Sequence, residues 1–257
     1  RVSEDFAAVL GQALAAAQWS QGLVTPTVAT ALRQAGYDRS FEQLPKRRTS
    51  AVFAPAPVAD WRQIEFQASS RQLCLPAAMN LDFGGIAKGW CADQTMRRLA
   101  EWGVVLVDAG GDIAVSGLWG QGQAWPVDLA DPFVDEQNMA QIQMGAGGLA
   151  TSGRDHRHWQ MGGRHCHHII DPRTGTPAHT DVLCATVAAP DVLRAETAAK
   201  ILLIQGSRAG LAWLDTQTEL AACIVTQQGQ RLDSQRWGAG YPAKRPIDAH
   251  GFTRPKS

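Results

Sequence analysis

A glycine pair followed by a lysine is the first feature of this sequence that could do chemistry. Residues 81–93 contain Asp82, the consecutive Gly84 and Gly85, and Lys88 near a predicted helix start. Paired glycines let backbone N–H groups approach a ligand closely, and a helix start with a nearby lysine favours a phosphate. The spacing differs from that of a Walker motif. The segment therefore indicates either a phosphate site or an ordinary tight turn.

A second glycine pair lies in residues 107–117, with Asp108 and Asp112 on either side of it. A predicted strand would deliver both carboxylates to one place. Aspartate is also common in turns, where its side chain accepts backbone hydrogen bonds. From the spacing alone, the turn is the better interpretation.

Histidines are concentrated in one section, because five of the seven lie between His156 and His168. We considered a zinc site, since alternating histidines in a strand share a face. The HExxH pattern of a zinc-binding helix is not found here. A single histidine that acts as a general base is the simpler interpretation, because its ordinary pKa lies near neutrality.

Glu196 and Lys200 lie four residues apart in a predicted helix over 191–205, so they face the same side and can pair. The simplest interpretation is a salt bridge on the surface, which would contribute little to stability.

Hydrophobic periodicity predicts the elements that position these segments. Helices are expected over residues 4–19, 26–36, 86–102, 191–205 and 208–215. Strands are expected after Trp61, around 104–108, 113–117, 125–129 and 150–153, before His168, and around 184–189 and 221–225, while residues 44–60 are interpreted as a loop. Helices and strands are therefore mixed along the chain.

The composition excludes several classes of protein. The 24 basic residues balance the 24 acidic ones, which argues against a nucleic-acid binder but allows a local anion pocket. The five cysteines are widely spaced, so we expect free thiols. Stretches long enough for a transmembrane helix are not found. The chain starts with Arg1, which we interpret as a processed or trimmed end.

Taken together, the segments resemble the ApbE family of flavin transferases. The resemblance spans about residues 4–225 and rests on five motifs in register: DFGGIAK at 82–88, AGGDIAVSG at 109–117, ATSG at 150–153, HIIDPRTG at 168–175, and the helix after TVAAP. It implies an α+β fold with mixed, largely antiparallel sheets flanked by helices. We expect one domain over residues 1–237 that lacks an N-terminal segment of the family, and a flexible tail over 238–257.

The resemblance also implies an activity. Members of the family bind FAD, split its pyrophosphate with the help of magnesium, and attach FMN through a phosphoester to a Thr or Ser hydroxyl of an acceptor flavoprotein, releasing AMP. FAD and a redox flavoprotein with an exposed Thr or Ser would thus be the partners, without nucleic acid, in the bacterial periplasm or at the inner-membrane face. The alternative is a metal-independent FAD-binding protein or an FAD pyrophosphatase with little transferase activity.

Residue by residue, the resemblance implies a general base, a nucleotide site and a metal site. The base would be His168, the nucleotide would be bound by Asp82, Gly84, Lys88, Ile169 and Lys200, and the metal would be bound by Gly85 and Glu196. The family has Asp and, four residues later, Thr or Ser where this sequence has Glu196 and Lys200. A protonated lysine has no lone pair for a metal. We therefore expect Lys200 to neutralise the pyrophosphate directly and leave the binding of Mg²⁺ open.

Overall fold

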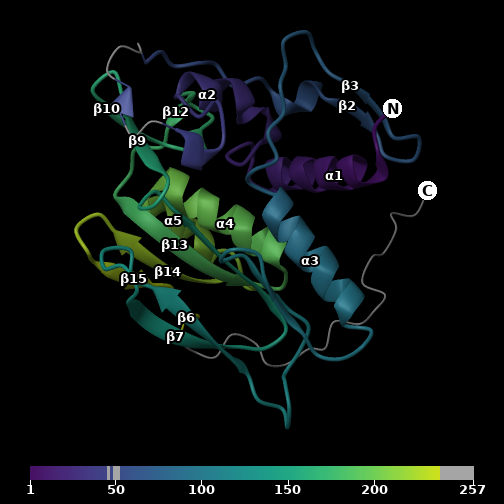
Figure 1. Cartoon of the computed structure of the whole chain (residues 1–257), viewed down its shortest axis with the longest axis vertical. Helices are drawn as coiled ribbons and strands as arrows, with labels where there is room; N and C mark the ends of the chain where they lie inside the picture. Colours follow the sequence, from purple (N-terminus) through teal and green to yellow (C-terminus); the bar gives the residue numbers. More distant parts are fainter. Residues whose placement is uncertain (45–46, 49–52, 238–257) are drawn as a thin grey trace.

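A computed structural model describes residues 1–44, 47–48 and 53–237 of the chain (Figure 1). The predicted tail, residues 238–257, lies outside the described residues. Within them, six strands form one antiparallel sheet in the order β15-β14-β13-β8-β5-β4. They are β4 (Leu106–Asp108), β5 (Ile113–Val115), β8 (Gly147–Gly153), β13 (Val182–Ala189), β14 (Ala221–Thr226) and β15 (Arg231–Asp233). Helices pack on this sheet, which confirms the predicted α+β class.

Helix α4 (Val192–Gln205) packs on strands β8 and β13 at the middle of the sheet (Figure 1). It begins after its N-cap Asp191, whose Oδ1 accepts a hydrogen bond from the Arg194 N–H at 2.8 Å. It ends at Gly206, whose φ of 85° favours glycine. Helices α3 (Ala87–Leu99) and α5 (Ser207–Asp215) flank it, and α1 (Glu4–Trp19) contacts both α3 and α4. The helices predicted over 4–19, 86–102, 191–205 and 208–215 are thus confirmed.

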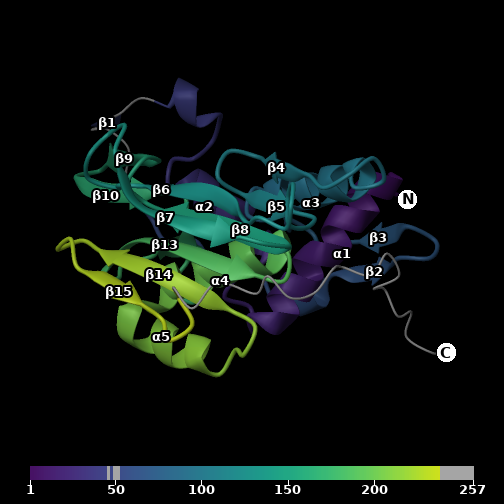
Figure 2. The ribbon, with the colours of Figure 1, turned by 90° about the horizontal axis from the view of Figure 1, so that it is seen from below.

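The hairpin of β6 (Trp125–Ala130) and β7 (Asn138–Met144) covers the other face of the sheet (Figure 2). Because side chains alternate across a strand, Leu149 of β8 packs with the hairpin while Ala150 packs with α4. Strand β6 confirms the predicted strand. Strand β7 was not predicted, although its apolar residues alternate with polar ones.

Shorter elements surround this centre. They are η1 (Pro26–Val28), α2 (Ala29–Gln34), η2 (Phe41–Gln43), β1 (Arg47–Arg48), η3 (Trp61–Gln63), β2 (Glu65–Gln67), β3 (Gln72–Cys74), β9 (His158–Met161), β10 (Arg164–His167), β11 (Ile170–Asp171) and β12 (Thr176–Pro177). Strand β1 pairs in parallel with β9, so the prediction of a loop throughout 44–60 was wrong at this point. A ladder with β9 satisfies backbone groups there that a loop would leave to water.

Two expectations from composition can be compared with the fold. All five cysteines lie in the described residues and are free, as predicted. In the same part of the chain, none of the helices combines the length and the hydropathy that a bilayer span requires.

Close contact between α4 and β8 depends on Gly148. A Cβ at Gly148 would overlap the backbone of Val192, whereas a Cβ at Gly11 in α1 would have no described atom within 4 Å outside its own helix. We expect Gly148→Ala to lower the free energy of unfolding by about 3 kcal/mol, because the backbone of α4 must move away. Gly11→Ala should raise it by up to ~1 kcal/mol. Urea unfolding of both variants checks this, and equal effects would contradict it.

Candidate functional site

A cavity of about 600 Å³ opens between the start of α3, the middle and end of α4, and the central sheet. Its wall includes every residue that the sequence analysis proposed for the site: Asp82, Gly84, Gly85, Lys88, His168, Ile169, Glu196 and Lys200. Segments more than one hundred residues apart in the sequence therefore meet in one place. Its volume lies within the roughly 300–1,000 Å³ range of small-molecule and cofactor sites.

The loop before α3 is held in shape by Asp82. Its Oδ1 accepts a hydrogen bond from the Gly84 N–H at 2.9 Å, and its own N–H donates to the Pro26 carbonyl at 2.8 Å. No side chain among the described residues caps the start of α3. In this 13-residue helix the Ala87 N–H donates to the Phe83 carbonyl at 2.8 Å. The N–H groups of Lys88 and Gly89 have no backbone acceptor among the described residues and are left for an anion. The segment is a tight turn and a candidate phosphate site at once.

The second glycine pair also lines the cavity. Asp108 Oδ1 accepts a hydrogen bond from the Gly111 N–H at 2.7 Å, as the turn interpretation predicted. Asp112 is buried, and its Oδ2 lies 2.7 Å from Lys88 Nζ. Asp112 was not among the predicted site residues. Its position directly after the glycine pair was the available signal.

Glu196 and Lys200 form the pair that their spacing predicted, with Oε1 and Nζ 3.1 Å apart. The expectation of a surface salt bridge was wrong, because the two side chains are only 3% and 15% exposed. The helix turns this face toward the sheet and the cavity. Burial raises the pKa of Glu196, and the charge of Lys200 offsets part of that effect.

A divalent cation does not fit the donors at Gly85 and Glu196. Glu196 Oε1 lies 3.1 Å from Lys200 Nζ, which leaves the buried Oε2, without a hydrogen-bond partner among the described residues, as the one free oxygen of this carboxylate. The Lys200 stem covers Gly85, where a Cβ would lie 2.9 Å from Lys200 Cε. Nowhere in the described part of the chain do three His, Cys, Asp or Glu side chains gather in a possible metal site. Magnesium prefers about six oxygen ligands in octahedral geometry, and an ammonium group offers none.

His168 lies between β10 and β11 and lines the cavity. Burial above all, then the charges of His167, Lys200 and Arg157, lower its pKa to about 3. Its Nδ1 is buried and accepts no hydrogen bond from the described residues. The ring is therefore neutral, which is the state a general base requires. A bound anion would raise this pKa again, because it stabilises the imidazolium.

Three other histidines of this section make structural contacts with other parts of the chain or with each other. His167 is buried, with its Nε2 2.8 Å from the Ala178 carbonyl and its Nδ1 3.3 Å from the Ile169 N–H. This arrangement requires a proton on Nε2 and a lone pair on Nδ1, hence a neutral ring. His158 and His165 stack with centroids 5.0 Å apart on β9 and β10. The zinc interpretation gains no support from this geometry.

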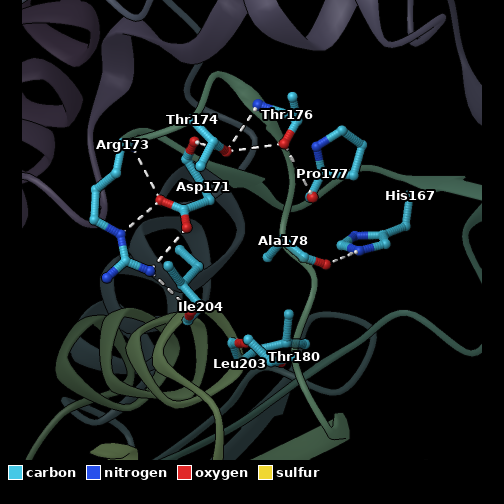
Figure 3. A network of polar contacts seen from close by, with 10 residues as sticks. All are labelled: His167, Asp171, Arg173, Thr174, Thr176, Pro177, Ala178, Thr180, Leu203 and Ile204. Carbon is cyan, nitrogen blue, oxygen red and sulfur yellow. Dashed lines mark hydrogen bonds and ion pairs between the residues drawn. The ribbon is translucent and has the colours of Figure 1, made fainter. Parts of the chain in front are cut away.

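A polar network fixes the turn that follows His168 (Figure 3). The Arg173 guanidinium donates to both carboxylate oxygens of Asp171, at 2.9 and 2.8 Å, and to the Ile204 carbonyl at 3.2 Å. Figure 3 shows this arginine reaching from the turn toward the end of α4. The loop that carries His168 is thereby tied to the helix that carries Lys200.

Several cavity residues were not predicted from the sequence. Tyr37 lines the cavity and stacks on Trp159, with ring centroids 5.5 Å apart, and its ring also lies beside His168. Asp155 and Arg157 belong to the loop between β8 and β9. Tyr37 follows a glycine directly, but spacing alone does not reveal that it reaches a site 131 residues further along.

Comparison with known proteins gives consistent results. The model of the ApbE family matches residues 1–224. A protein of Treponema pallidum described as "FAD:protein FMN transferase" is 32% identical over 233 residues, which cover 83% of this chain and 63% of that protein. A protein of Klebsiella pneumoniae with the same description is 31% identical over 58% of this chain and 46% of its own length. The chain thus spans between about half and two thirds of these curated relatives.

Solved structures agree on the fold. The ApbE protein from Thermotoga maritima has a TM-score of 0.78 and 24% identity, covering 94% of this chain and 79% of that one. The flavin transferase ApbE from Vibrio cholerae has a TM-score of 0.71, with 24% identity over 91% of this chain and 75% of that one. The α+β fold and its resemblance to ApbE are confirmed.

The buried His167 makes stability depend on pH. Burial lowers its pKa from 6.5 to about 4 in the folded protein. The unfolded chain binds the proton more tightly, so the free energy of unfolding should fall as the pH drops from about 6.5 to 4, by up to roughly 3 kcal/mol. His167→Gln should flatten this part of the pH curve, measured by urea unfolding, while the same change at the exposed His179 should leave it unchanged. Parallel curves for wild type and His167→Gln would refute the assignment.

Proposed function

Because this chain belongs to the ApbE family, we propose that it is an FAD:protein FMN transferase. It attaches FMN from FAD through a phosphoester to a Thr or Ser hydroxyl of an acceptor flavoprotein and releases AMP. The observation that carries the proposal is the meeting of all eight predicted site residues in one cavity of about 600 Å³. The curated relatives with this activity support it.

The cavity wall provides what a dinucleotide pyrophosphate needs. The uncapped start of α3 offers backbone N–H groups beside the Gly84 and Gly85 turn, and Lys88 adds a positive charge. Asp82 already bonds to its own loop, so it acts on the nucleotide by holding these N–H groups in place. Ile169 and other apolar residues of the wall give the flavin rings a surface to pack on.

The reaction follows from the position of His168. A threonine or serine hydroxyl is a weak nucleophile, and a neutral histidine within reach takes its proton as the oxygen attacks. The new bond joins that oxygen to the phosphorus of the FMN half. The bond from this phosphorus to the bridging oxygen breaks, and AMP leaves with that oxygen and its electron pair. The charge that develops on the phosphates raises the pKa of His168 toward the range in which it accepts the proton.

Removal of the base should separate catalysis from binding. We expect His168→Ala to lower the rate of AMP release and of transfer by about 10²–10⁴-fold while the FAD affinity stays within about twofold. Flavin fluorescence gives the affinity, and a fluorescent acceptor band on a denaturing gel gives the transfer. His165→Ala, an exposed histidine outside the cavity wall, is the matched control. Equal loss of affinity and rate in His168→Ala would exclude the role of base.

Asp82 should act through its oxygen rather than its charge. Asp82→Ala removes the acceptor of the Gly84 N–H, and we expect FAD affinity to fall about tenfold because the turn loosens. Asp82→Asn keeps an oxygen at Oδ1 and should retain affinity within about twofold. Equal weakening in both variants would show instead that the carboxylate charge is needed.

A further inference from the structure

Both lysines in the described residues, Lys88 and Lys200, line the same cavity. Each is held by a buried carboxylate: Asp112 Oδ2 lies 2.7 Å from Lys88 Nζ, and Glu196 Oε1 lies 3.1 Å from Lys200 Nζ. An ammonium group has three N–H donors, so each lysine keeps donors for a ligand after this contact. The wall therefore presents two fixed positive charges to a ligand.

The position of Lys200 is built by the residues around it. Its stem passes over Gly85, where any side chain would meet Lys200 Cε at 2.9 Å. Its Nζ also lies 3.5 Å from the Glu196 carbonyl, one turn earlier in α4. The Glu196 carboxylate fits only because Gly89 leaves space for Oε2. Two glycines and one glutamate thus hold a lysine in a single place.

A buried lysine and glutamate are a costly way to stabilise a fold. Apolar side chains of similar size often stabilise a buried position as well or better, because both charges must leave water. The rest of this face of α4 is apolar, with Val192, Ala195 and Ala199 among its buried residues. Thr197 is also buried, but the pair is the charged exception, and it lies where the helix lines the cavity.

We infer that the Lys200 ammonium takes the place of a divalent cation at the pyrophosphate, with Gly85 and Glu196 as the residues that position it. This inference rests on the proposed function. Lys200 and Lys88 together would donate to the phosphate oxygens through the N–H groups that their contacts with Glu196 and Asp112 leave free. Lys200 also stabilises the charge that develops on the phosphates as the bond between them breaks. Both FAD binding and its cleavage would then proceed without a divalent metal.

The test measures two quantities, the FAD affinity by flavin fluorescence and the rate of AMP release. Each is measured once in EDTA and once with added Mg²⁺. In the wild type we expect each quantity to change by less than about twofold between the two conditions. Lys200→Met should weaken FAD binding about 10- to 100-fold in EDTA. Lys200→Arg should keep most of the affinity, and Gly85→Ala should weaken it because the added methyl displaces the lysine. Arg208→Met removes an exposed charge on α5 and is the matched control.

Two results would overturn the inference. One is a wild type whose FAD affinity collapses in EDTA and returns with Mg²⁺; the other is a Lys200→Met variant that binds FAD in EDTA as tightly as the wild type. The measurements of FAD binding do not depend on whether the proposed transfer reaction takes place. If FAD binding is insensitive to EDTA and depends on Lys200, but AMP and flavinylated acceptor never form, the transferase proposal fails and the assignment of Lys200 holds.

Discussion

The contact between α4 and the backbone of β8 is the constraint on which the site depends. Gly148 lets the start of α4 come so close to β8 that no side chain fits between them. That distance determines where Glu196 and Lys200, one and two turns further along, meet Gly89 and Gly85. The same helix lines the cavity beside the Asp82 loop, because the Lys200 stem lies over Gly85. A different spacing of helix and sheet would move both charges away from the glycine turns.

The two ion pairs join each lysine of the site to a carboxylate, within a chain whose formal charge is zero. Each ammonium of the two pairs is compensated by a carboxylate, so neither lysine needs a ligand to offset its charge. A ligand with phosphates then competes for donors that are already in place. Selectivity in such a site comes from geometry more than from attraction at a distance.

Much of the local structure could be predicted from the sequence, and most of the tertiary detail could not. The periodicity of residues 4–19 and 191–205 predicted α1 and α4 well, and the Glu196 and Lys200 spacing predicted their pairing. The burial of that pair depends on which face of α4 is turned inward. The spacing of residues along one helix does not indicate which face that is. The contact between Gly85 and Lys200 joins residues 115 positions apart, so it follows only from the packing.

The link between Arg173 and the Ile204 carbonyl joins the His168 loop to the end of α4, while the start of that helix rests on β8. Both ends of α4 are therefore anchored, and His168 and the partly buried Lys200 share one rigid support. In such an arrangement the side chains of the site lose their conformational entropy when the chain folds. Little further conformational entropy is then lost when a ligand binds. The cavity is a preorganised one, whose walls need not close around the molecule they receive.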